Sequence, residues 1–160
     1  MSNLRRRFTT DRQGRIHPHL SPQERDLLAT LPAQVLELIA EEDPSTRRLF
    51  PQAYPNDAAA EREYKSLVGE SLLDHHRQSL EAFTEGVAAE AVEEADLQLW
   101  MGALEVLRLV LGTKLDVIED MAEVAEDDPR APGLALYGYL SMLQDEVVAA
   151  LARTLPAAGS

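Results

Sequence analysis

The stretch from Leu97 to Ile118 constrains the fold more than any other part of the chain. Its apolar residues recur at helical spacing. They are Leu97, Trp100, Met101, Leu104, Leu107, Val110, Leu111, Leu115 and Ile118. Leu109 widens this stripe beyond one face, which is typical of a helix that packs on several sides. Charged residues interrupt the stretch, so it is not a membrane span. We therefore expect a central helix within a helical bundle.

A second helix is predicted to begin at Ser21. Ser21 can cap it, Pro22 suits its first position and Glu24 completes a capping box. The apolar residues that follow keep helical spacing as far as Asp43-Pro44, which should end the helix. Pro32 lies inside this run and is expected to kink or split the helix.

A long third helix is predicted from about Asp57 to Glu85, with Gly86 as its stop. Residues 44–50 should form a short helix before it. The residues expected on its inner side are Tyr64, Leu67, Val68, Leu72 or Leu73, Leu80 and Phe83. A last helix is predicted over residues 131–155. Its inner residues are expected to be Leu134, Tyr137, Leu140, Met142 or Leu143, Val147, Val148 and Leu151.

Residues 5–20 predict a β-hairpin. RRFTT and RIHPHL flank the turn Asp11-Arg12-Gln13-Gly14, in which Gly14 can adopt a positive φ. Pro18 has no N–H to donate, so its strand should lie at an edge. Val92, in the acidic connector 87–96, is expected to form a short extended piece. The fold class is therefore mainly α, with four to five helices. A single domain spans residues 1–160, with a basic hairpin segment (1–20), a bundle (21–155) and a frayed tail (156–160).

Positive and negative charge are separated along the chain. Residues 1–20 contain one acid, Asp11, and five arginines: Arg5, Arg6, Arg7, Arg12 and Arg15. The whole chain has a net charge of −13, so the body after these residues is strongly acidic. Duplex DNA binding depends on many phosphate contacts, which such a body repels. We interpret the five arginines as a partner-binding patch and expect any DNA contact to be indirect or to involve them alone.

No pattern in the chain indicates an enzyme, a cofactor or a metal site. The absence of cysteine excludes disulfides and thiolate ligands, and phosphate-binding, nucleophile-elbow and EF-hand motifs are absent. His75 and His76 point about 100° apart on a helix, so they do not easily share one ion. A metalloenzyme using either of them is a distant alternative. His17 and His19 share one face of a strand, where a cationic contact surface is favoured over a metal that would need a third ligand.

Arg108 is the unusual residue of the central stretch, because it stands between Leu107 and Leu109. A buried guanidinium needs a partner, and Glu105 lies three residues earlier. A structural ion pair is the favoured interpretation. The alternative is an anion or partner-peptide site in a groove between helices.

Three long stretches resemble one family. They are LFPQAYPNDAAAEREYKSL (49–67), LWMGALEVLRLVLGTKLDV (99–117) and DPRAPGLALYGYLSMLQDEVVAAL (128–151), and the opening RRFTTDRQGRIHPHLSPQE fits as well. The chain is similar in these stretches to an actinobacterial family first described as domain of unknown function 2017. Some of its members are oxidative-stress transcriptional regulators.

The resemblance implies a cytoplasmic, non-enzymatic regulator of the oxidative-stress or cysteine-synthesis type. Such a protein would act by contacting a sigma factor or RNA polymerase. The alternative is an adaptor or scaffold linked to Clp-type proteolysis, without a transcriptional role. Redox-responsive members carry a cysteine pair near the N-terminus, and this chain has no cysteine. A thiol switch is therefore not expected. No leader for secretion is expected either, because polar residues follow Arg5–Arg7.

Overall fold

Helix α4 (Glu94–Lys114) is the centre of the fold, as its apolar pattern predicts. It packs against α3 (Glu70–Ala88), α5 (Ala131–Thr154), α1 (Pro22–Ala40) and the 3₁₀ helix η1 (Pro44–Leu49). Its buried residues are Leu97, Trp100, Ala103, Leu104, Val106, Leu107, Val110, Gly112 and Thr113. The predicted Ile118 lies outside the described residues.

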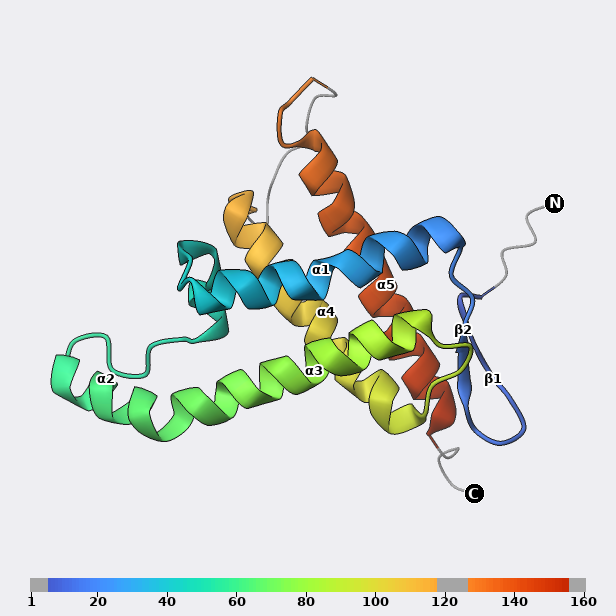
Figure 1. The fold of residues 1–160 in the computed structure, drawn as a ribbon, viewed down its shortest axis with the longest axis horizontal. Coiled ribbons are helices and arrows are strands. Elements are labelled where there is room, and N and C mark those ends of the chain that lie inside the picture. Colours follow the sequence, from blue (N-terminus) through green and yellow to red (C-terminus); the bar gives the residue numbers. More distant parts are fainter. Residues whose placement is uncertain (1–5, 118–126, 156–160) are drawn as a thin grey trace.

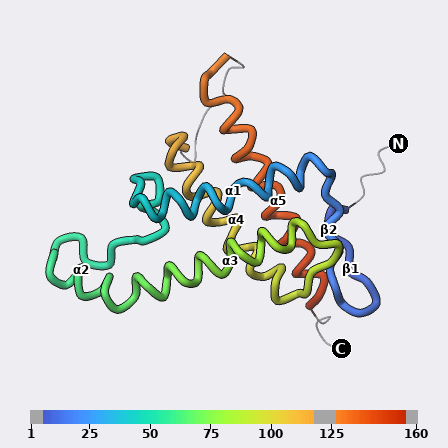
Figure 2. The backbone as a smooth tube through the Cα atoms, viewed as in Figure 1, coloured from blue at the N-terminus to red at the C-terminus, as the bar shows by residue number. Residues whose placement is uncertain are grey.

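The computed structural model describes residues 6–117 and 127–155. In Figure 1, α1 and α3 run across α4 and α5, and the β-hairpin lies at one end of the assembly. Helix α2 (Ala58–Tyr64) lies at the opposite end. The tube in Figure 2 follows the same path from the blue hairpin to the red α5, whose end returns to the hairpin. The mainly helical fold class is confirmed.

Helix α1 begins as predicted. The Ser21 hydroxyl accepts a hydrogen bond from the Glu24 N–H, and the Glu24 carboxylate accepts one from the Ser21 N–H, each at 3.1 Å. This pair forms the capping box. Pro32 does not split the helix, which continues through it to Ala40 with the proline ring buried. Burial of the ring against the bundle offsets the backbone hydrogen bond that proline cannot make.

The long third helix is present, but it is not uniformly packed. It consists of α2, a π-helical turn η2 (Lys65–Gly69) and α3. Leu80 and Phe83 are fully buried, as predicted. In contrast, Leu67 is 73% exposed and Val68 is 36% exposed. The expected inner side is therefore wrong for the first half of this helix, which extends beyond the bundle.

Gly86 does not stop α3, which continues to Ala88. It lies instead under the indole of Trp100, where a Cβ atom at position 86 would be 2.6 Å from Nε1. Trp100 is fully buried, and its ring meets Phe83 and Phe8 edge-on at centroid distances of 4.8 and 5.9 Å. Glycine at position 86 therefore allows α3 and α4 to pack closely.

Helix α5 closes the bundle over nearly the range predicted for it. Leu140, Leu143 and Val147 are buried, whereas Val148 is 44% exposed. Val148 was expected on the inner side and is wrongly placed there, because the helix turns it away from α4. Gly112, near the C-terminal end of α4, lies close to the ring of Tyr137 of α5, so α4 and α5 also pack closely there.

Candidate interaction surface at the hairpin

The hairpin consists of β1 (Phe8–Thr10) and β2 (Ile16–Pro18), paired in antiparallel register with Thr9 opposite His17. Gly14 in the turn has φ of 81°, which explains glycine at this position. Ile16 forms a β-bridge with Val92, so the extended piece predicted in the α3–α4 connection is confirmed. The bridge attaches β2 to the α3–α4 connection.

Arg25 of α1 holds the hairpin in place through backbone carbonyls alone. Its guanidinium donates to the carbonyl oxygens of Pro18, Leu20, Val87 and Ala89 at distances of 2.5 to 3.3 Å. Pro18 ends β2 and Leu20 follows it, while Val87 and Ala89 lie at the C-terminal end of α3. A cation at a helix C-terminus also interacts favourably with the helix dipole. One side chain thus joins the hairpin to α1 and α3.

Arg7 is a second anchor. Its guanidinium pairs with Glu24 of α1 and Glu146 of α5, both at 3.0 Å. The Tyr139 hydroxyl donates to the same Glu24 carboxylate at 2.6 Å. Burial and this hydrogen bond raise the pKa of Tyr139. Arg153 of α5 donates to the Phe8 carbonyl at 2.9 Å. The N-terminal strand is therefore fixed to both α1 and α5.

The pKa of Glu24 follows from this network. Partial burial opposes ionisation, but hydrogen bonds from Tyr139, Ser21 and Arg7 outweigh it and lower the pKa of the carboxyl. A carboxylate with a lowered folded pKa stabilises the fold above its unfolded pKa of about 4.3 and loses that contribution as the pH falls through the folded value.

We expect Glu24→Gln to lose about 1 kcal/mol of unfolding free energy at pH 7, because the charge-assisted hydrogen bonds become neutral. Its unfolding free energy should then fall less steeply than that of the wild type between about pH 5 and pH 3. Urea denaturation at several pH values measures both effects. Glu81→Gln, at an exposed site, is the control. Equal slopes for wild type and Glu24→Gln would contradict this role of Glu24.

The five N-terminal arginines do not form one uniform patch. Arg7 is engaged in the network above, and Arg15 pairs with Glu93 at 3.3 Å on the surface. Arg6 and Arg12 are exposed and make no side-chain hydrogen bond or ion pair within residues 6–117 and 127–155. Arg5 lies outside the described residues. Arg6 and Arg12 are therefore the described arginines of this group that remain available to a partner.

The two hairpin histidines face a shallow pocket between β2 and the beginning of α1. His17 pairs with Asp11 at 2.8 Å, and its ring stacks on His19 with centroids 6.5 Å apart. The hydrogen bond from His17, followed by backbone hydrogen bonds from Arg15 and Gln13, lowers the pKa of Asp11. The pocket is also lined by Arg25 and Glu90. Its charged groups are thus of both signs.

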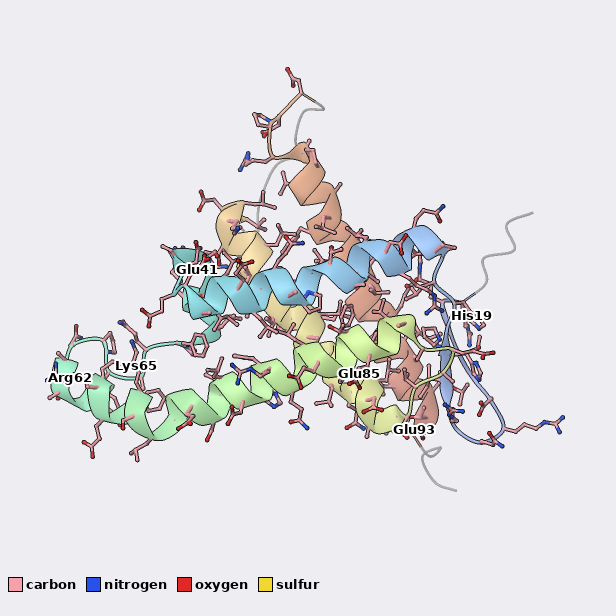
Figure 3. The ribbon with its side chains drawn as sticks, in the orientation of Figure 1. His19, Glu41, Arg62, Lys65, Glu85 and Glu93 are labelled. Carbon is pink, nitrogen blue, oxygen red and sulfur yellow. The ribbon has the colours of Figure 1, made fainter. Side chains whose placement is uncertain are left out.

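An acidic segment adjoins the hairpin. Between Arg77 and Arg108 the sequence has no Lys, Arg or His. Within residues 81–96 the exposed carboxylates are those of Glu81, Glu85, Glu90, Glu93, Glu94 and Asp96, which we call the acidic segment. Figure 3 shows Glu85 and Glu93 at the same end of the molecule as His19. Arg15 of the hairpin pairs with Glu93 of this segment, so the basic hairpin adjoins a surface of the opposite sign.

Arg108 and Glu105 form an ion pair at 3.3 Å. The Arg108 side chain is 26% exposed, donates to Ser141 at 2.9 Å and to Gln144, and lies over the Tyr137 ring. These contacts link α4 to α5. The ion pair with Glu105 and the cation–π contact with Tyr137 thus engage the Arg108 guanidinium within the fold.

The remaining histidines, His75 and His76, do not lie in a cluster of metal-binding side chains. His75 is exposed, and His76 bonds to the Leu49 carbonyl at 3.0 Å and meets Phe50 edge-on. Across the described parts of the chain, no group of three His, Cys, Asp or Glu side chains is placed to hold a metal. Within the same residues, every helix is too short or too polar to cross a membrane.

A family model for a domain of unknown function, DUF2017, matches residues 5–151. The chain belongs to the DUF2017 family. No curated protein and no solved structure matches the chain. The DUF2017 match includes Arg7, Arg25 and Glu146, so these anchors of the hairpin lie within the family domain, whereas Arg153 lies two residues beyond it.

Sequence reasoning missed Arg25 in this DUF2017 domain. Arg25 follows the capping box by one residue and looks like an ordinary solvent-facing helix residue. Its acceptors are backbone carbonyls, two of them more than 60 residues away. A sequence pattern does not show which distant backbone carbonyls will lie near a side chain in the fold. The one available signal was that Arg25 stands close in the sequence to the predicted hairpin and to the start of the helix that follows it.

Proposed function

We propose that the protein is a non-enzymatic, cytoplasmic regulator of transcription that binds a sigma factor or RNA polymerase through the hairpin end of the molecule. The observation that carries this proposal is the acidic segment, joined to the basic hairpin by the Arg15–Glu93 ion pair and the Ile16–Val92 bridge. Charge complementarity of this kind selects partners and speeds their association. A partner with a basic surface and a smaller acidic patch would match it.

The acidic segment supports a protein partner over duplex DNA. Phosphate binding requires clustered cations, whereas the acidic segment presents six exposed carboxylates, of which Glu93 pairs with Arg15. Polymerase and sigma subunits, which bind DNA themselves, present basic surfaces. The adaptor function linked to Clp-type proteolysis predicts a different partner for the same surface.

Binding of purified RNA polymerase, with and without sigma factors, tests the proposal. We expect Glu81→Gln with Glu85→Gln to slow association about tenfold at low salt, because two steering charges are lost. Asp26→Asn with Glu37→Gln is the matched control, since these α1 acids are exposed and lie outside the acidic segment. Surface immobilisation with kinetic readout at two salt concentrations measures the difference.

Three outcomes contradict the proposal. They are no binding to polymerase or any sigma factor, binding to a Clp component in place of polymerase, and equal losses in the two double variants. The first two overturn the transcriptional partner. The third places the contact away from the acidic segment.

A further inference from the structure

The pocket between β2 and the beginning of α1 has a volume of about 470 Å³, which is within the range of small-molecule sites. Two apolar residues, Pro18 and Leu20, line it together with five polar ones. Figure 3 shows His19, one of the five, at the hairpin end of the molecule. An apolar surface with a few polar groups of both signs is typical of a site that fixes a small charged ligand in one orientation.

Three of the polar residues have a hydrogen atom to donate to a ligand. The Arg25 guanidinium has five N–H groups, and four of them bond to backbone carbonyls, so one N–H on Nη2 has no partner among the described residues. The Ser21 hydroxyl accepts a bond from the Glu24 N–H and keeps its own proton. A Thr9 hydroxyl that donates to Nε2 of His19, 2.7 Å away, leaves Nδ1–H of His19 as a donor. These three donors suit a carboxylate.

The other two polar residues are acceptors. Glu90 is exposed, and within the described residues its carboxylate makes no ion pair or side-chain hydrogen bond. His17 lies with Nε2 2.8 Å from the Asp11 carboxylate, which can only accept, so Nε2 carries the hydrogen and Nδ1 of the neutral ring is an acceptor. An ammonium group brings three donors and a positive charge. Glu90 and His17 therefore suit an ammonium group.

We propose that this pocket binds a free α-amino acid with an apolar side chain. The carboxylate of the ligand would contact the three donors, its ammonium group the two acceptors, and its side chain the two apolar residues. A ligand with a single charge would leave one of these polar sets without a partner, which lowers affinity. Because Glu90 belongs to the acidic segment, a bound amino acid would also remove one carboxylate from the surface that the segment offers to a protein partner.

Three ligands of similar size separate the contributions of the two charges. They are L-leucine, 4-methylpentanoate, which lacks the ammonium group, and 3-methylbutylamine, which lacks the carboxylate. We expect leucine to bind the full chain with a dissociation constant of about 1 mM, since a small ligand makes few contacts, and each analogue about tenfold more weakly. Nuclear magnetic resonance shifts of the Leu20 and Ser21 amide signals, recorded at neutral pH over a ligand titration, measure the three affinities.

One substitution assigns the ammonium contact. Glu90→Gln should weaken leucine binding about fivefold, as expected for an exposed ion pair, and leave 4-methylpentanoate binding unchanged, because that analogue has no group for Glu90 to contact. Glu85→Gln is the matched control, since it removes the same charge from an exposed site of the acidic segment that does not line the pocket. Circular dichroism checks that both variants keep their helices, which is expected for substitutions of exposed side chains.

Amide signals that do not move at the highest leucine concentration overturn the proposal. Equal affinities for leucine and 4-methylpentanoate overturn it as well, because the ammonium group then has no partner in the pocket. A loss in Glu85→Gln as large as that in Glu90→Gln also overturns it, since the effect is then one of overall charge. These outcomes do not depend on polymerase binding, so this proposal and the transcriptional one fail separately.

Discussion

Gly86→Ala should be the most damaging small substitution in the protein, lowering the unfolding free energy by about 3 kcal/mol. The added methyl group would lie 2.6 Å from Nε1 and 2.7 Å from Cζ2 of Trp100. The indole is fully buried between Phe8 and Phe83 and is rigid, so it cannot turn aside. The backbones of α3 and α4 must then move apart. Urea denaturation, with the slope compared between variants, measures the loss.

Gly138→Ala is the matched control, because it makes the same chemical change inside α5. No atom lies within 4 Å of a Cβ at position 138. Alanine is favoured over glycine in a helix by about 1 kcal/mol, so this variant should be slightly more stable than the wild type. The two substitutions are thus expected to have opposite signs. A Gly86→Ala variant as stable as the wild type would show that α3 and α4 tolerate a wider separation.

Arg25→Ala is expected to cost about 3 kcal/mol of unfolding free energy, because four backbone carbonyls lose a charged donor at once. Arg25→Lys should recover only part of this loss, since an ammonium group is compact and cannot span acceptors on both the hairpin and α3. Arg77→Ala is the control. Its guanidinium is half exposed, and its ion pair with Asp74 is long, at 3.8 Å.

Hydrogen exchange distinguishes local from global effects of Arg25→Ala. The Ile16 and Val92 N–H groups bond to each other's carbonyls at 2.8 Å, and we expect both to exchange faster in the variant. Amides in the middle of α4 should follow the global stability. If Ile16 and Val92 keep their protection relative to α4, the hairpin is held by the bridge and by Phe8 rather than by Arg25.

Local sequence signals predicted the elements that depend on local physics. The capping box at Ser21, the positive φ of Gly14 and the apolar spacing of residues 97–115 each describe interactions within a few residues. The β-bridge at Val92 was also expected as an extended piece. These local signals were therefore sufficient to predict the order of the helices, the hairpin and the central helix without knowledge of distant contacts.

The errors arise where tertiary packing decides. Glycine is typical of a helix end, which is why Gly86 was predicted as one. The close approach of the Trp100 ring, which leaves no room for a Cβ atom, explains glycine at this position better. Leu67 and Val68 have the spacing of an inner face, but periodicity does not tell which half of a long helix has a neighbour. Pro32 looked like a break, and its burial keeps it inside α1.

The candidate site was predicted only in part. Its location at the basic N-terminus is a sequence inference, but the sequence could not separate Arg7, which holds the fold together, from Arg12, which faces solvent. That difference depends on Glu146, which lies 139 residues away from Arg7. Likewise, the partners of Arg108 on α5 follow from the packing of two helices and not from their separate patterns.

The bond between Arg153 and the Phe8 carbonyl spans 145 residues and has a consequence during synthesis. Translation makes the hairpin before α5, so the groups that secure β1 from α5 do not yet exist when β1 is synthesised. Closing so long a loop is also a late event in refolding. We therefore expect the hairpin arginines to remain accessible on the nascent chain until α5 has emerged from the ribosome.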